Sequence, residues 1–342
     1  MLKRWQFWLG LLISAGCLAL VLRGMHLGEV WQAMRTARYG WIVPGVAVYF
    51  FGVWARTWRW HYMLRPIQTV PLRGLFPVVA IGYMGNNIYP ARAGELIRAY
   101  VLKRREGVSV SASLATIVVE RIFDGVVMLL FVFIALPLTP MPAWLRQVVV
   151  MASLLFFGAL GLFFVIAVQQ ERAQAIYSGL IERLVPAPLQ PRAQGLADRF
   201  MAGLHCLRSG RDVLMIFATS LVVWLAETVK YWFVMHSFHF SVPFIVLMLM
   251  NGVVNLATTV PSAPGYVGTF DAPGIEVLAT FGVPRSIATA YTLVLHAALW
   301  FPITALGAYY FWRESVSWAE WAVVAQAEGN EGESPISSGA SR

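Results

Sequence analysis

Charged residues are scarce in this sequence, while long hydrophobic runs are abundant. Charged side chains make up 13% of the 342 residues, whereas soluble domains usually carry about 25%. Hydrophobic residues make up 58%, and the mean hydropathy is +0.65. The composition therefore excludes an ordinary soluble domain and indicates an all-α polytopic membrane protein.

Cysteine is also scarce, and familiar catalytic motifs are absent. The two cysteines, Cys17 and Cys206, lie in an apolar run and a basic stretch, which excludes a disulfide framework and a cysteine-rich metal site. GxSxG, HExxH, P-loop and CxxC patterns do not occur, and the six histidines lack metal-ligand spacing. We therefore expect no metal, no cofactor and no enzyme of the classes that these motifs mark.

Six apolar runs reach or approach the roughly 18 residues that are needed to cross a bilayer. Trp and Tyr cluster near their ends, as they do at membrane interfaces. The first run lacks a small-x-small cleavage site, so we expect it to remain as a span. The six predicted spans cover residues 5–22, 41–60, 114–136, 148–168, 213–235 and 287–312.

Two further apolar runs, residues 75–89 and 244–260, are shorter and contain polar residues. Runs of this length suit re-entrant segments as well as full spans. Basic loops remain in the cytoplasm, so the positions of Lys and Arg distinguish these alternatives. If both runs re-enter, the basic regions at the N-terminus and at 56–73, 92–105 and 169–212 are all cytoplasmic.

We therefore favour six full spans plus two re-entrant segments over eight spans, with both termini in the cytoplasm. This orientation accounts for most of the net charge of +9, so the charge does not indicate nucleic-acid binding. Residues 1–312 form the predicted transmembrane domain, with halves at about 1–168 and 213–312 and a cytoplasmic linker at 169–212. Residues 313–342 are polar, and we expect them to be disordered.

The two short runs are followed by similar sequences. PARAG, beginning at Pro90, has the same proline-to-glycine spacing as PSAPG, beginning at Pro261, and GVSVS at Gly107 matches GVPRS at Gly282. The order of span, broken segment and span also occurs twice. In the favoured topology the first half enters from outside and the second from inside, which predicts an inverted-topology repeat with a binding site where the broken segments meet.

The broken segments carry residues that interrupt helices. Irregular backbone survives in a membrane only where it is buried in protein or lines a wet cavity. Asn87 can donate and accept hydrogen bonds there, while glycine and proline permit turns and end helices. An interfacial turn is the alternative for each segment. The predicted breaks are Pro90, Gly94, Pro261, Pro264 and Gly268.

Charged residues also occur within two predicted spans. Glu120 and Asp124 share a helix face, and Arg121 can reach Asp124. Glu227 and Lys230 are spaced as an ion pair. Charges in spans cost several kcal/mol, so they pair or face a cavity. Structural ion pairs and a binding site are both compatible with these positions.

Arginines near the first broken segment form a candidate anion site. The planar guanidinium group binds phosphate with two parallel hydrogen bonds. Arg92, Arg98 and Arg121, with Glu95 nearby, are therefore the predicted phosphate-binding cluster.

These motifs resemble those of a known family. NIYPARAGE at 87–95, with Arg98 and ERIFD at 120–124, resembles the first signature of the flippase-like family built on the lysylphosphatidylglycerol synthase transmembrane region. PSAPGYVG at 261–268, with FGV at 281–283, resembles the second. The resemblance covers about residues 5–312. It implies lipid translocation, and Asp271 stands where many relatives have an acidic residue.

The sequence and the resemblance together predict a flippase-like lipid translocase of the bacterial inner membrane. Its substrate would be an anionic or modified phospholipid, a glycolipid, or an isoprenoid or hopanoid lipid. No soluble aminoacyltransferase domain follows the spans, so we do not expect lysine transfer. Predicted substrate-binding residues are Asn87, Arg92, Glu95, Arg98, Glu120, Arg121, Asp124, Gly265 and Asp271.

Two alternatives remain. One is a membrane-embedded transferase acting on a polyprenyl-phosphate or hopanoid lipid, with Glu95, Glu120 or Asp124 as acid or base. The other is a noncatalytic partner of a lipid-synthesis complex. The expected partners are a membrane lipid and lipid-biosynthesis enzymes.

Overall fold

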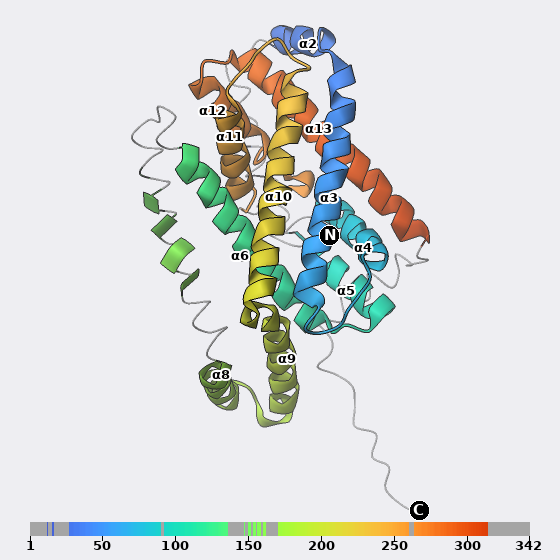
Figure 1. The fold of residues 1–342 in the computed structure, drawn as a ribbon, viewed down its shortest axis with the longest axis vertical. Coiled ribbons are helices and arrows are strands. Elements are labelled where there is room, and N and C mark those ends of the chain that lie inside the picture. The colour runs from blue at the N-terminus through green and yellow to red at the C-terminus, as the bar shows by residue number, and fades with distance from the viewer. Residues whose placement is uncertain are drawn as a thin grey trace, which may run out of the picture.

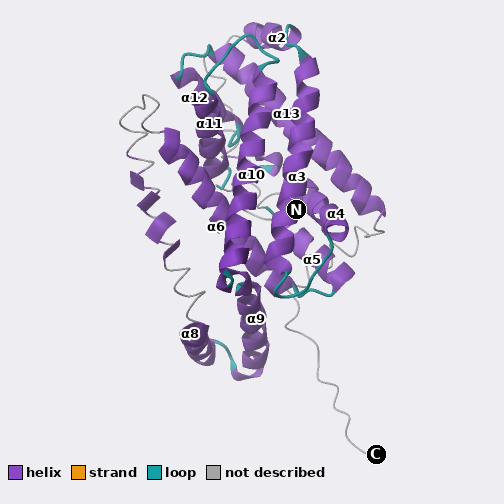
Figure 2. Ribbon diagram, viewed as in Figure 1, coloured by secondary structure: helices purple, strands orange, loops and turns teal. Residues whose placement is uncertain are grey.

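The computed structural model describes residues 27–89, 92–135, 170–259 and 263–313, together with single positions between 12 and 161. Within them all regular secondary structure is helical, which confirms the all-α prediction for these residues (Figure 2). Several predictions fall outside the described residues. They concern Pro90, Pro261, the predicted disordered tail after residue 313 and most of the spans predicted at 5–22 and 148–168.

The eight helices that build the centre fall into two sets of four along the chain. The first set is α3 (Ile42–Leu64), α4 (Leu72–Ile88), α5 (Gly94–Glu106) and α6 (Val110–Ala135). The second is α10 (Gly210–Met235), α11 (Phe244–Ala257), α12 (Asp271–Thr280) and α13 (Arg285–Arg313). The short apolar runs predicted at 75–89 and 244–260 correspond to α4 and α11.

Helices of each set pack against helices of the other set. The helices α3 and α10 run side by side through the centre (Figure 1). The helix α4 packs on α13, and α11 packs on α6, so each broken pair contacts the other half of the chain. In Figure 1 the pair α4–α5 lies toward the lower end of the molecule, and the pair α11–α12 lies toward the upper end.

Small residues allow the broken helices to approach closely. A Cβ on Gly94 would lie 1.9 Å from the carbonyl oxygen of Gly82, and a Cβ on Gly85 would lie 2.8 Å from the Cα of Gly94. Gly94 thus begins α5 directly against α4, and glycine is required there because any side chain would clash with backbone. Gly107, after α5, and Gly282, after α12, both have left-handed φ values, of 74° and 83°, which glycine adopts without strain.

The linker between the halves is also helical. It contains α8 (Gln170–Leu184) and α9 (Gln190–Gly203) and lies below the bundle in Figure 1. The helix α9 packs on α6, where the Ser111 hydroxyl donates to the carbonyl of Leu196 at 2.8 Å. Remaining described helices are α2 (Leu27–Arg35) and the 3-10 turns η1 (Tyr39–Trp41), η2 (Ala187–Leu189), η3 (His205–Arg208) and η4 (Pro264–Tyr266).

Two of the described helices, α10 and α13, are long and apolar enough to cross a membrane by length and composition. The helices α3 and α6, with 23 and 26 residues, are as long as spans but carry charged side chains in their interiors. The number of spans and the inverted repeat remain predictions.

Candidate functional site

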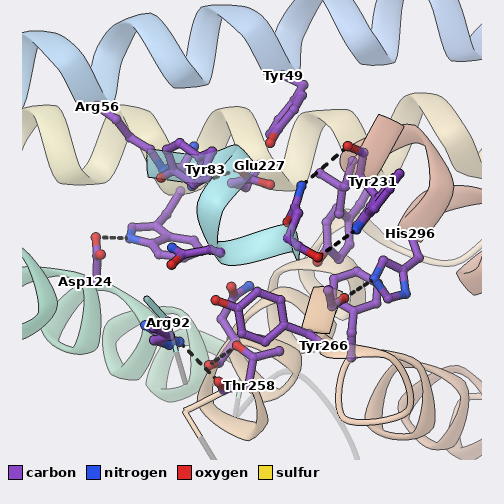
Figure 3. Close-up of a pocket in the computed structure, with 18 of the residues that line it drawn as sticks. Tyr49, Arg56, Tyr83, Arg92, Asp124, Glu227, Tyr231, Thr258, Tyr266 and His296 are labelled. Carbon is purple, nitrogen blue, oxygen red and sulfur yellow. Dashed lines mark hydrogen bonds and ion pairs between the residues drawn. The ribbon is translucent and has the colours of Figure 1, made fainter. Parts of the chain in front are cut away.

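A cavity of about 140 Å³ lies between the two halves (Figure 3). Residues of α3, α4, α6, α10, α11 and α13 line it, together with Arg92 between α4 and α5 and the loop that precedes α12. Much of its lining is polar and aromatic, including Tyr49, Tyr83, Tyr231 and Tyr266. A cavity of this size and polarity holds water in a protein interior.

Arg59 of α3 joins three helices behind the cavity. Its guanidinium Nη1 lies 2.5 Å from Asp124 Oδ1, and its Nη2 lies 3.0 Å from Glu120 Oε1, both on α6. Nη1 also donates to the Ser220 hydroxyl of α10 at 2.9 Å. The Trp224 indole donates to the same Asp124 oxygen at 2.8 Å. Arg59 is fully buried, so these acceptors replace its water shell.

Glu120 contacts three arginines. Besides Arg59, its carboxylate accepts from Arg98 Nη2 at 2.7 Å and from Arg121 Nη2 at 3.0 Å. Arg98 is buried and stacks over the Trp60 ring, 4.4 Å from the ring centroid. Neither Glu120 nor Arg98 lines the cavity, so this ion pair supports the cavity wall from behind and does not face the cavity.

Arg121 and Arg92 do reach the cavity. Arg121 is 37% exposed, and its Nη1 lies 3.4 Å from Asp124 Oδ2. Glu95 lies between the two arginines, 3.4 Å from Arg121 Nε and 3.6 Å from Arg92 Nη1. Arg92 Nη2 donates to the carbonyl of Thr258 at 3.2 Å, which links the first broken segment to α11 of the second half.

A second buried charge group lies on the other side of the cavity. Arg56 Nη2 is 2.8 Å from Glu227 Oε1, and Lys230 pairs with the other oxygen of Glu227. The Arg56 guanidinium also lies over the Tyr83 ring, 5.6 Å from its centroid. Its Nη1 is buried and has no hydrogen-bond partner within the described part of the chain. Arg56 therefore offers an unused donor at the cavity wall.

The charges around the cavity do not cancel. Apart from the pair of Asp271 and His296, the ion pairs around the cavity join six cationic side chains to four carboxylates, so two positive charges remain in excess within this set. Away from water such an excess attracts anions strongly. The cations are Arg56, Arg59, Arg92, Arg98, Arg121 and Lys230, and the carboxylates are Glu95, Glu120, Asp124 and Glu227.

A series of hydrogen bonds links the second broken segment to His296 of α13. Gly265, with φ of 72°, presents its carbonyl to His296 Nε2 at 2.7 Å. His296 Nδ1 lies 2.9 Å from Asp271 Oδ1, and Asp271 Oδ2 accepts from the Gly268 N–H at 2.9 Å. The Phe270 ring lies against the imidazole, with centroids 4.6 Å apart.

Asn87 lies near the end of α4 and ties it to α13. Its side-chain Nδ2 donates to the Thr304 hydroxyl at 2.8 Å, and its backbone carbonyl accepts from the Trp300 indole at 3.4 Å. These contacts satisfy polar groups where the helix ends between the two halves, as irregular backbone in a membrane requires.

The predicted binding residues divide into two groups in the structure. The group that lines the cavity comprises Asn87, Arg92, Arg121, Asp124 and Gly265. The other group lies outside the lining. Glu95, Glu120 and Asp271 each form an ion pair or hydrogen bond with a lining residue, whereas Arg98 pairs with Glu120. Of the predicted breaks, Gly94 begins α5, and Pro264 and Gly268 lie in the loop before α12.

Several site residues were missed by sequence reasoning. Arg56 and Arg59 lie where the span predicted at 41–60 overlaps the basic region 56–73, and neither is among the predicted site residues. The helix α3 continues to Leu64 and buries both side chains. Their i, i+3 spacing at the end of an apolar run was the available signal, since it places both on one helix face. His296 is likewise absent from the predicted site residues, although it lines the cavity.

A family model described as the lysylphosphatidylglycerol synthase TM region matches residues 7–307. The chain belongs to this family. A UPF0104 membrane protein from Methanothermobacter thermautotrophicus is 23% identical, over 87% of this chain and 92% of that protein. A second one from the same organism is 26% identical, over 78% and 82%. The resemblance inferred from the motifs is thus confirmed, and the chain is a membrane protein.

Another relative in sequence carries a different name. It is called glycosyltransferase AglD, from Haloferax volcanii, and is 23% identical over 87% of this chain but only 52% of that protein. The alignment with this chain therefore spans about half the length of that relative. No solved structure matches the chain.

Proposed function

We propose that the protein translocates a lipid with an anionic, phosphate-bearing head group across the membrane. The observation that carries this proposal is the cavity between the two halves with two positive charges in excess. A phosphate group would neutralise that excess and accept hydrogen bonds from arginine. The lipid tails would remain in the bilayer while the head group occupies the polar cavity.

Arg121, Arg92 and Arg56 are the residues that would bind the head group. Each lines the cavity, Arg121 is partly exposed, and Arg56 has an unused buried donor. Glu95, Asp124 and Glu227 hold these guanidinium groups in place. In this proposal Arg98 is a positioning residue and not a phosphate ligand, because it is buried against Glu120 and Trp60.

The transport step would be a rocking of the two halves about the fixed site, as in transporters built from inverted repeats. Three observations support an inverted repeat. The broken pairs lie toward opposite ends of the molecule, α4 and α11 pack on the opposite half, and Gly107 and Gly282 share a left-handed conformation. The same proposal places the protein in the inner membrane of a bacterium with both termini in the cytoplasm.

Reconstitution into liposomes tests this function. Phosphatidylglycerol with a fluorescent acyl chain is incorporated, and dithionite quenches the label in the outer leaflet; protein that moves the lipid raises the quenched fraction above one half. We expect Arg121→Ala to slow this movement at least tenfold and Arg121→Lys to slow it less. The matched control is Arg285→Ala, which removes an exposed arginine paired with Glu276. Equal rates for Arg121→Ala and the wild type would reject the proposed site.

A membrane-embedded transferase is the second candidate, and the likeness to a protein called a glycosyltransferase favours it. The arrangement of carboxylates favours translocation instead. Glu95, Glu120 and Asp124 each lie in an ion pair with arginine, and general acid catalysis needs a carboxyl that can hold a proton. Mass spectrometry of the lipid after incubation separates the two, since a translocase leaves its mass unchanged.

A further inference from the structure

His296 of α13 contacts the loop before α12 and the first residue of α12, one through each of its ring nitrogens. Nε2 lies 2.7 Å from the Gly265 carbonyl oxygen, and Nδ1 lies 2.9 Å from Asp271 Oδ1. Asp271 begins α12 and also binds the Gly268 N–H. The Asp271 side chain is 2% exposed and that of His296 is 13% exposed, so both groups lie largely out of contact with bulk water.

The two hydrogen bonds require two protons. A carbonyl oxygen and a carboxylate oxygen only accept, whereas a neutral imidazole has one N–H. One proton must therefore lie on Nε2 and another between Nδ1 and Oδ1. The pair then carries no net charge, as an imidazolium beside a carboxylate or as a neutral imidazole beside a carboxylic acid. Removal of one proton makes the pair anionic and leaves one nitrogen lone pair facing an oxygen.

We propose that Asp271 and His296 form a proton-binding site, and that this proton holds the loop 263–270 closed against α13. The inference rests on the proposed function, because it assigns the energy source for lipid movement to a proton. Loss of the proton leaves the carboxylate bonded to Nδ1–H and breaks the bond between Nε2 and the Gly265 carbonyl.

The loop is placed where its release would alter the cavity. Tyr266 and His296 lie at the cavity in Figure 3, and Arg92 from the other half approaches the Tyr266 ring to 5.8 Å from its centroid. A Cβ on Gly265 would lie 2.8 Å from the Trp300 indole nitrogen. Tyr266 is held at a φ of 61°, a strained conformation that persists only when the surroundings impose it.

The other charged groups at the cavity are less suited to exchange protons near neutral pH. Guanidinium groups remain protonated, and they belong to Arg56 of α3, Arg121 of α6, and Arg92 before α5. The carboxylates of Asp124 and Glu227 are paired with arginine.

The other titratable groups near His296 are paired or are phenols. Lys230 of α10 is paired with Glu227, and the other described acid of α12, Glu276, pairs at the surface with Arg285. The helix α4 contributes a tyrosine and two asparagines to the cavity, and α2 contributes none of its described lining. The other lining phenols are Tyr49, Tyr231 and Tyr266. Histidine is the side chain whose charge ordinarily changes between about pH 5 and 8.

A fluorophore on the loop tests the proposal without any lipid. Bimane is attached to V267C in the full chain with Cys17→Ser and Cys206→Ser, because Val267 is 40% exposed on the loop. We expect Trp300, which lies against Gly265 of the same loop, to quench bimane while the loop is closed, and a Trp300→Phe variant checks the source of quenching. We expect emission to rise at least twofold, in a single transition, between pH 5 and pH 8.5.

Two variants make the expectation specific. With Asp271→Asn, a neutral imidazole accepts from the amide at Nδ1 and still donates from Nε2 to Gly265, so emission should stay low at every pH. His296→Gln should also remove the transition. The matched control is His61→Gln, because His61 of α3 contacts the Val70 carbonyl away from the cavity, and it should keep the wild-type curve. A wild-type curve for Asp271→Asn, or a flat curve for the wild type, would overturn the proposal.

The liposome assay on the same variants separates this inference from the proposed function. Loop opening with pH but no lipid movement would support the proton site and reject translocation. Lipid movement that is independent of pH, with constant bimane emission, would reject the proton site and leave translocation standing.

Discussion

Arg59 on α3 and Asp124 on α6 form a buried ion pair, with Nη1 and Oδ1 2.5 Å apart. The same arginine also contacts Glu120 at 3.0 Å and Ser220 at 2.9 Å. It is the most buried of the arginines near the cavity, and it joins both halves through α10. The walls of the candidate site therefore depend on a charge that no ligand can reach.

We predict that Arg59→Met destabilises the protein by about 3–5 kcal/mol, because it removes a counter-charge that two buried carboxylates, Glu120 and Asp124, share. Thermal unfolding of purified protein in detergent measures this. Arg285→Met removes an exposed pair and should cost at most about 1 kcal/mol. Adding Asp124→Asn to Arg59→Met should recover part of the loss. Equal unfolding temperatures for the two single variants would contradict the proposed network.

Gly94 should not tolerate alanine. Its Cβ would meet the Gly82 carbonyl at 1.9 Å, so α4 and α5 must move apart, and overpacking of this kind costs about 1–3 kcal/mol or more. The measurement is the unfolding temperature together with the yield of monodisperse protein. Gly40 provides the control because a Cβ there meets nothing within 4 Å.

Cys206 should be unreactive in the folded protein. It is fully buried in the linker, and burial raises the pKa of its thiol from 9.0 to about 12. At pH 8 the thiolate is then about a thousandfold less populated than in the unfolded chain, and the thiolate is the reactive form. Maleimide labelling of a Cys17→Ser variant should be negligible until denaturant is added. The same shift means that stability falls as the pH rises above 9.0, where the unfolded thiol ionises.

The inverted arrangement predicts opposite accessibility of the two broken segments. In a cysteine-free background, Ala263→Cys should react in whole cells with a membrane-impermeant thiol reagent. Ala93→Cys should react only after the inner face is exposed. Labelling of both positions from one side would exclude the inverted repeat.

Local patterns in the sequence predict much of the fold. The apolar runs at 75–89 and 244–260 correspond to α4 and α11. Each helix ends where its run reaches residues that cannot continue a helix. The i, i+4 spacing of Glu120 and Asp124 places both on one face of α6, and in the structure that face contacts Arg59.

Contacts between distant segments could not be predicted in the same way. Arginine near the end of an apolar run fits a cytoplasmic loop as well as a buried pair, so the sequence does not predict the ion pairs of Arg56 and Arg59. The contact between Asp271 and His296 depends on how α12 crosses α13, and no local pattern contains that crossing angle.

The exchange of partners between the halves has a consequence for synthesis. The helix α4 leaves the ribosome early, but the helix on which it packs, α13, is among the last to be made. Until then the polar end of α4, including Asn87, lacks the Thr304 and Trp300 groups that it binds in the finished protein. The first half must therefore enter the membrane with one side of α4, including its polar end, lacking the partners that α13 supplies later.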